Sequence, residues 1–247
     1  MSDRGARGAR GAHYTLVTPA NHYPCRLPNL PGAQVVKLVT PRLAPARFAQ
    51  YLVELPPGNG TGGAMPAGFE HFFYGLEGEA VVELDGRSVS LGPGAFAYGP
   101  DDVGVALRGG AATGRVLWLK RSYEPFPGLD EPPPVAGHRD DEPFEPTAAP
   151  GLHRRELLDP GDPRHDFNMS LLAFDPDAGL DKIEIHDEEH GLYMTAGEGR
   201  YELDGDHHEV RTNDFIYMAP YCPQSFASRK DLGAEYLLYK DVYRDGF

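Results

Sequence analysis

Cysteine is scarce in this chain, where only Cys25 and Cys222 occur among 247 residues. The two lie far apart and neither belongs to a Cys-x-x-Cys pair, which excludes a redox or zinc motif of that spacing. We therefore expect two reduced thiols rather than a disulfide, as is usual in a cytoplasmic protein.

Basic residues are also few, with 23 Lys and Arg against 37 Asp and Glu, which gives a formal net charge of −14. Phosphate binding needs clustered Lys and Arg, so we expect no nucleic-acid partner. No run approaches the roughly 18 apolar residues that a membrane span requires, so we expect no membrane partner. Residues 1–12 are rich in Arg and Gly without the apolar segment of a secretory signal, and we interpret them as a disordered tail.

Turn-forming and aromatic residues, in contrast, are plentiful. The chain has 30 Gly, 24 Pro, 13 Tyr and 12 Phe, and its Val, Leu and Ile residues fall in many short runs. This composition favours an all-β protein over a helical one.

The chain contains an internal repeat at an offset of 119 residues, which relates residues 71–86 to residues 190–205. Among the identities that carry it, His71, Gly78, Glu79, Glu83, Leu84, Asp85 and Gly86 recur as His190, Gly197, Glu198, Glu202, Leu203, Asp204 and Gly205. In each copy the Asp-Gly pair lies between alternating residues and indicates a β-hairpin. We infer a tandem duplication of one small antiparallel barrel or jelly roll.

The stretch between the copies, residues 124–150, is rich in Pro and acidic residues and is typical of an extended linker. It separates an N-terminal domain, residues 13–123, from a C-terminal domain, residues 151–247. Within the first of these, residues 13–39 hold strand-like material that could complete a sheet of either half.

A candidate metal site lies in the second copy. Glu184 and His186 are two residues apart, so on a β-strand they point to the same face. His190 follows before Gly191, where a turn could bring its imidazole to the same point, and Gln224 comes 34 residues later. Such a mixed nitrogen and oxygen set suits Mn²⁺, Fe²⁺, Zn²⁺ or Ni²⁺, and the lack of thiolate argues against a structural zinc. The alternative is a solvated acidic loop.

The repeat provides an internal control for this site. At the same offset Glu184 corresponds to Met65, His186 to Ala67 and Gln224 to Val105, and His190 alone keeps its counterpart, His71. One histidine is not enough to hold a catalytic metal. We therefore expect the N-terminal domain to lack a metal site and to serve in packing or dimerisation.

These features resemble the cupin superfamily, and the duplicated form resembles a bicupin with two tandem jelly-roll-like barrels. The motifs in residues 189–194, 197–201, 214–218, 223–224 and 236–242 are similar to those of the (S)-ureidoglycine aminohydrolase family. That resemblance implies Mn²⁺ held by Glu184, His186, His190 and Gln224. It implies hydrolysis of (S)-ureidoglycine to (S)-ureidoglycolate and ammonia in allantoin and purine catabolism, by a cytoplasmic homo-oligomer.

Four protein ligands on a six-coordinate Mn²⁺ would leave two positions that the carboxylate and amine of the substrate could chelate. Lys240 closes the last strand, and we expect it to act in proton transfer and substrate binding beside Glu184, with a pKa lowered by desolvation. Tyr201 and Tyr236 are candidates to hydrogen-bond the substrate.

Two other functions remain open at this point. A cupin dioxygenase with Fe²⁺ or Ni²⁺ would use a similar mixed site, although Gln224 in place of a third histidine disfavours it. A non-catalytic cupin binding protein would retain the metal without turnover, because fold alone does not fix function.

Overall fold

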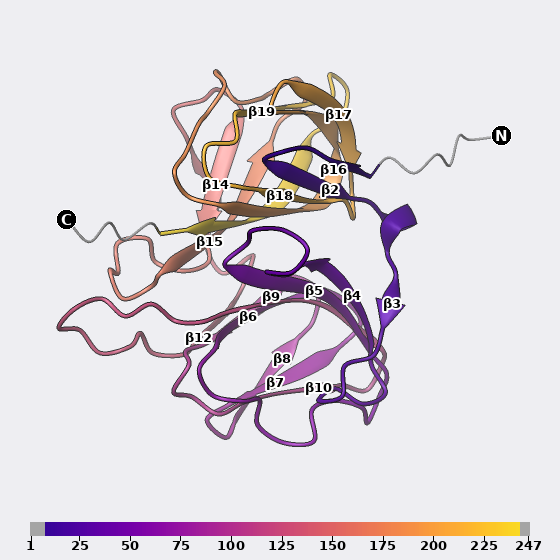
Figure 1. The fold of residues 1–247 in the computed structure, drawn as a ribbon, viewed down its shortest axis with the longest axis vertical. Helices are drawn as coiled ribbons and strands as arrows, with labels where there is room; N and C mark the ends of the chain where they lie inside the picture. The colour runs from indigo at the N-terminus through magenta and orange to yellow at the C-terminus, as the bar shows by residue number, and fades with distance from the viewer. Residues whose placement is uncertain (1–7, 243–247) are drawn as a thin grey trace. The chain divides into compact units, whose positions relative to one another are not determined.

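The computed structural model describes residues 8–242 of the chain. Strands dominate it, and the one helical element in that range is the short 3₁₀ turn η1 (Pro19–Asn21). None of its helical segments is long and apolar enough to cross a membrane. The all-β expectation is therefore confirmed (Figure 1).

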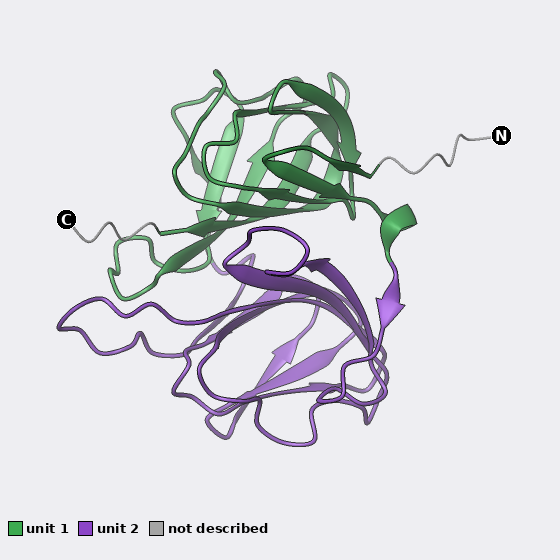
Figure 2. Cartoon of the chain, viewed as in Figure 1, with its two compact units in different colours: residues 1–22, 142–247 green, residues 23–141 purple. Residues whose placement is uncertain are grey.

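The chain forms two compact units, shown in different colours in Figure 2. One comprises residues 23–141. The other comprises residues 142–247 together with residues 1–22.

The unit of residues 23–141 is built from ten strands. In chain order they are β3 (Pro24–Cys25), β4 (Gln34–Val39), β5 (Phe48–Leu55), β6 (Glu70–Glu77), β7 (Ala80–Leu84), β8 (Arg87–Leu91), β9 (Ala95–Gly99), β10 (Val105–Gly109), β11 (Gly114–Arg121) and β12 (Val135–His138). One sheet has the order β12-β9-β6-β11-β5-β4-β3, and a smaller one has the order β10-β7-β8. Buried apolar side chains from both sheets form one core between them.

The other unit also contains ten strands. They are β1 (Ala9–Arg10), β2 (Tyr14–Val17), β13 (Glu145–Pro146), β14 (Leu152–Glu156), β15 (Phe167–Phe174), β16 (His190–Leu203), β17 (Asp206–Arg211), β18 (Phe215–Met218), β19 (Gln224–Ser228) and β20 (Ala234–Asp241). The main path is β1-β2-β18-β16-β20-β15-β14-β13, and β17 and β19 pair with the far end of β16. The long strand β16 thus belongs to both walls of the barrel.

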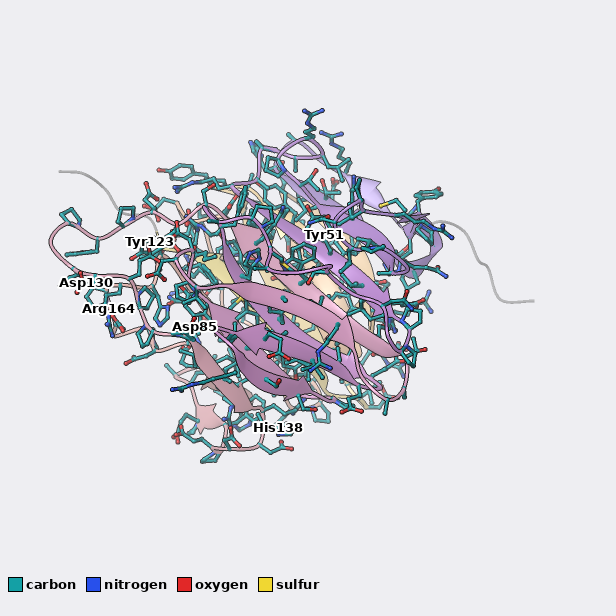
Figure 3. All side chains as sticks on the ribbon, turned by 90° about the horizontal axis from the view of Figure 1, so that it is seen from below. Tyr51, Asp85, Tyr123, Asp130, His138 and Arg164 are labelled. Carbon is teal, nitrogen blue, oxygen red and sulfur yellow. The ribbon has the colours of Figure 1, made fainter. Side chains whose placement is uncertain are left out.

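Both predicted hairpins are present. Asp204 and Gly205 have φ angles of 52° and 84° and join β16 to β17. Asp85, labelled in Figure 3, and Gly86 have φ angles of 49° and 76° and join β7 to β8. Two successive positive φ angles are the signature of a two-residue hairpin turn that suits Asp-Gly. The repeated Asp-Gly pairs therefore fix equivalent corners of the two barrels.

The observed division of the chain differs from the predicted one at both boundaries. β2 pairs with β18, so residues 14–17 complete the sheet of the C-terminal unit and do not belong to a domain of residues 13–123. The expectation that residues 13–39 could complete a sheet of either half is confirmed, because β3 and β4 join the sheet of the other unit. β1 lies inside the segment predicted as a disordered tail, of which residues 1–7 fall outside the described range. β18 would otherwise be an edge strand, and the sequence does not reveal which exposed edge a distant strand will cover.

The predicted linker, residues 124–150, is divided between the two units. Its strand β12 pairs with β9, whereas β13 pairs with β14, and the division falls between residues 141 and 142. Both strands lie at sheet edges, where a Pro-rich segment can add a few hydrogen bonds without a place in the core.

Candidate metal centre

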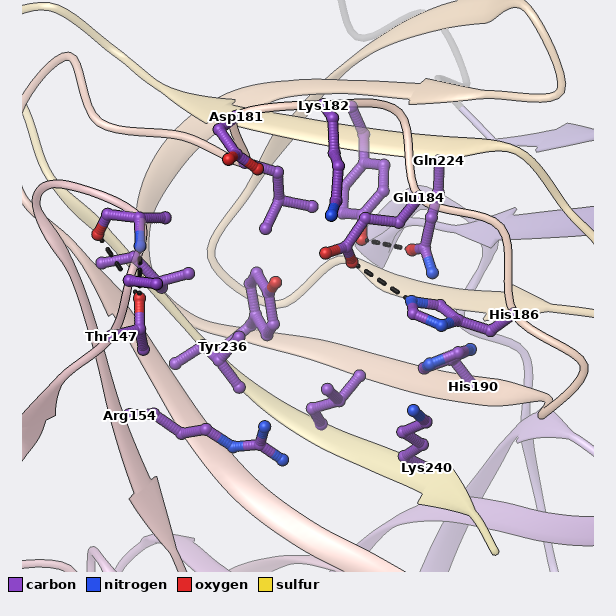
Figure 4. A pocket seen from close by; sticks show the side chains of 17 residues that line it. Thr147, Arg154, Asp181, Lys182, Glu184, His186, His190, Gln224, Tyr236 and Lys240 are labelled. Atoms are coloured by element: carbon purple, nitrogen blue, oxygen red, sulfur yellow. Dashed lines mark hydrogen bonds and ion pairs between the residues drawn. The ribbon is translucent and has the colours of Figure 1, made fainter. Parts of the chain in front are cut away.

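A cavity of about 340 Å³ opens in the unit that carries the second repeat (Figure 4). Its lining contains every residue that the sequence analysis selected for a site: Glu184, His186, His190, Tyr201, Gln224, Tyr236 and Lys240. Residues from four separate stretches of the chain are thereby brought to one place.

The first two candidate ligands lie on an extended segment that makes a single bridge instead of a regular strand. Glu184 and Gln224 exchange backbone hydrogen bonds of 2.8 and 2.9 Å, and the carbonyl of His186 accepts one from the N–H of Tyr221. The alternation expected of a strand still holds, because Glu184 and His186 face the cavity while Ile183 and Ile185 are exposed.

His190 occupies the first position of β16, paired with Lys240 on β20 and Met218 on β18. The chain bends at residues 187–188, before this histidine, and not at Gly191 as the sequence analysis assumed. The ring lies 5.1 Å from that of His186, measured between centroids. Burial, with smaller effects of His186 and Lys240, lowers the pKa of His190 to about 3. Its imidazole is therefore neutral at physiological pH, as a metal ligand must be.

Glu184 likewise has the protonation state that a metal ligand needs, an ionised carboxylate. A hydrogen bond with His186 outweighs partial burial and lowers the pKa of Glu184. Nε2 of His186 and Oε2 of Glu184 lie 3.2 Å apart (Figure 4). Two ligands at right angles on an ion ~2.1 Å from each would lie about 3 Å apart, so this spacing fits a shared metal.

Gln224 begins β19 and is buried, and its Oε1 accepts a hydrogen bond of 2.9 Å from the hydroxyl of Tyr201. A half-turn of the terminal amide exchanges oxygen and nitrogen in the same volume, which would present Oε1 to a metal and Nε2 to Tyr201. Burial raises the pKa values of Tyr201 and Tyr236, so both remain neutral hydroxyl donors.

Within residues 8–242 no three His, Cys, Asp or Glu side chains already surround a single point as a metal cluster. The candidate set has only three such residues, and two of them, Glu184 and His186, contact each other. The fourth candidate is an amide. The donor chemistry nevertheless fits a divalent metal, because two imidazoles, a carboxylate and an amide oxygen border one cavity.

Sequence reasoning missed charged residues here, among them Glu188 and Arg154. Oε1 of Glu188 lies 3.2 Å from Nζ of Lys240, and Arg154 on β14 lines the cavity. Glu188 belongs to the acidic run of residues 187–189, which is typical of a solvated loop. Arg154 could have been noticed, because it is two residues after Leu152 and so shares that residue's face of the strand.

The first repeat shows what happens at the equivalent place without these ligands. His71 pairs with Lys120 there, just as His190 pairs with Lys240. Nε1 of Trp118 donates a hydrogen bond of 3.1 Å to Nδ1 of His71, and Trp118 stacks on Phe73. Trp118 lies two residues before Lys120, where the second repeat has the smaller Leu238 before Lys240.

Residues 176–240 match the family model of the AraC-like ligand binding domain. A curated protein of Oryza sativa subsp. japonica, described as probable (S)-ureidoglycine aminohydrolase, is 30% identical over 94% of this chain and 74% of its own length. The (S)-ureidoglycine aminohydrolase of Escherichia coli K12 is 30% identical over 94% of this chain and 90% of its own length.

The crystal structure of protein Ylba from E. coli superposes with a TM-score of 0.85 at 27% identity, over 98% of this chain and 97% of that one. Together with two barrels built on one repeat, this defines the chain as a bicupin. The chain belongs to the (S)-ureidoglycine aminohydrolase family, a family of hydrolytic enzymes.

Proposed function

We propose that this protein hydrolyses (S)-ureidoglycine to (S)-ureidoglycolate and ammonia with the help of Mn²⁺. The observation that carries the proposal is the convergence of Glu184, His186, His190, Gln224 and Lys240 on one cavity. Relatives that are named for this activity and match 94% of the chain support it.

Glu184, His186, His190 and Gln224 would hold the metal, which when bound supplies a Lewis acid and a template for the amine and carboxylate of the substrate. The protein contributes the correct protonation states, because the pKa values of Glu184 and His190 are both lowered. Fe²⁺, Zn²⁺ and Ni²⁺ accept the same donors. We therefore choose Mn²⁺ among these ions because of the family to which the chain belongs.

The hydrolysis breaks the bond between the α-carbon and the amino nitrogen and forms a bond from that carbon to a water oxygen. The water loses one proton and the departing amine gains one. We assign the movement of this proton to Nζ of Lys240, and its position in the cavity lining across from His190 supports that role. Glu188 holds that ammonium group at 3.2 Å.

Two tyrosines of the cavity wall would orient the rest of the substrate. Tyr201 and Tyr236 are 1% and 2% exposed, and each contributes a neutral hydroxyl to the cavity wall. A hydroxyl that donates to a carboxylate or carbonyl oxygen fixes the stereocentre relative to the metal ligands. We place the reaction in the cytoplasmic breakdown of allantoin and purines, and we expect the enzyme to act as a homo-oligomer.

Ammonia release from freshly generated (S)-ureidoglycine tests the proposal. The Mn²⁺-loaded protein is compared with its Glu184→Ala variant, above the spontaneous decay of the substrate, and the chirality of the ureidoglycolate is determined. We expect fast, stereospecific release that the variant loses. A metal-loaded protein with no rate above background would contradict the aminohydrolase assignment, and oxygen uptake would then test a dioxygenase.

A further inference from the structure

Arg154 is a cation on an otherwise mostly apolar part of the cavity wall. It lies on β14, where it pairs with Leu172 of β15, and Leu172 in turn pairs with Tyr236 of β20. Arg154, Leu172 and Tyr236 therefore form one row across the sheet, and all three line the cavity.

The contacts of Arg154 leave part of its guanidinium directed at the cavity. Nε lies 2.6 Å from Oε1 of Glu156, and Nη2 lies 3.5 Å from Oγ of Ser170. Figure 4 shows the guanidinium pointing from the wall into the open space beside Tyr236. A guanidinium has five N–H donors in a planar fork, so these two contacts do not exhaust it.

The backbone positions of this row and of the His190–Lys240 pair are separated along β20. Tyr236 and Lys240 are four residues apart on β20, which corresponds to ~13 Å along the strand. Lys240 stands opposite His190, so Arg154 is attached to a row of the sheet four residues away from the His190–Lys240 pair. A group that reaches Arg154 must extend away from the atoms held at the metal.

We infer that Arg154 binds the carbonyl oxygen of the substrate's ureido group and so selects ureido acids over simple α-substituted acids. This inference rests on the proposed function. If the amine and carboxylate are held at the metal end, the ureido arm is the part of the substrate that projects along the cavity. Its carbonyl is a planar acceptor, which a guanidinium fork matches better than a lysine does.

Binding of two product-like acids tests this without relying on turnover. The probes are (S)-ureidoglycolate and glycolate, which lacks the ureido arm, and each is titrated into the Mn²⁺-loaded protein by calorimetry. In Arg154→Gln we expect affinity for (S)-ureidoglycolate to fall about 10- to 100-fold, with glycolate affinity changed less than about twofold. Arg154→Lys should recover only part of the loss.

Arg200→Gln is the matched control, because Arg200 is exposed on the same barrel and does not line the cavity. It removes the same charge and should leave both affinities unchanged. Equal losses for both acids in Arg154→Gln, or no loss for either, would overturn the inference even if the wild type releases ammonia. A wild type that neither releases ammonia nor binds (S)-ureidoglycolate would instead remove the proposed function, and this inference with it.

Discussion

His190 and Lys240 stand directly opposite each other in the antiparallel pair formed by β16 and β20. The same pair exists in the first repeat as His71 and Lys120 on β6 and β11. The two barrels thus share one backbone arrangement of an imidazole and an ammonium group. They differ in the surroundings, because only the second adds Glu184, His186 and Gln224 on its cavity wall.

This equivalence gives a matched pair of variants. Lys240→Met removes the proposed proton carrier, and we expect kcat to fall about 100- to 10,000-fold with bound metal unchanged. Lys120→Met removes the equivalent ammonium of the first repeat, which packs over Phe69, and should leave kcat within about twofold. Steady-state rates with metal analysis check both. A Lys240→Met enzyme of near-normal kcat would remove Lys240 from the mechanism.

Metal removal should destabilise the unit that carries the cavity. A ligand at a hundred times its Kd stabilises the folded state by about 2.7 kcal/mol, so chelation should lower the melting temperature of the wild type by several degrees. Glu184→Gln should bind metal more weakly and lose most of this response. His207→Ala, at an exposed position in the same barrel, serves as the control that should retain it. A variant lacking Glu184 that still melted with the full metal-dependent shift would contradict the ligand assignment.

The repeat and the Asp-Gly corners made the fold predictable, because a hairpin turn is a local property of two residues. Residue types and family motifs also predicted the grouping of four side chains in one cavity, namely Glu184, His186, His190 and Gln224. The attachment of β2 to β18 was not predictable, since strand pairing over 200 residues leaves no local signal. The Glu188–Lys240 contact was missed for the same reason.

Acid should destabilise the unit of residues 23–141 through His71. Burial, together with Lys120, lowers the pKa of His71 to about 3, whereas an unfolded histidine has a pKa near 6.5. Between these values the unfolded chain binds one more proton than the folded one, so stability falls as pH drops from about 6.5 toward 3. The expected slope is about 1.4 kcal/mol per pH unit for this group. Denaturant unfolding of the wild type and His71→Leu measures it, and an unchanged slope in the variant would contradict this origin.

Trp118 fills the core of the barrel formed by residues 23–141, so we expect its substitution to lower the free energy of unfolding without changing the enzymatic rate. Trp118 is 1% exposed, stacks on Phe73 and contacts Tyr51 at 5.0 Å between ring centroids. Trp118→Leu installs the residue found at the equivalent place in the second repeat. The smaller side chain leaves a cavity and an unpartnered Nδ1 on His71, at a cost of about 2–4 kcal/mol.

Denaturant midpoints and ammonia release, measured on the same preparations, separate the two effects. Leu238→Ala is the matched change at the equivalent position, and because Leu238 lines the cavity we expect it to alter KM for (S)-ureidoglycine. Trp118→Leu should leave kcat and KM unchanged below its unfolding transition. A fall in kcat of the folded Trp118→Leu protein would show that the first barrel contributes to the reaction beyond its packing.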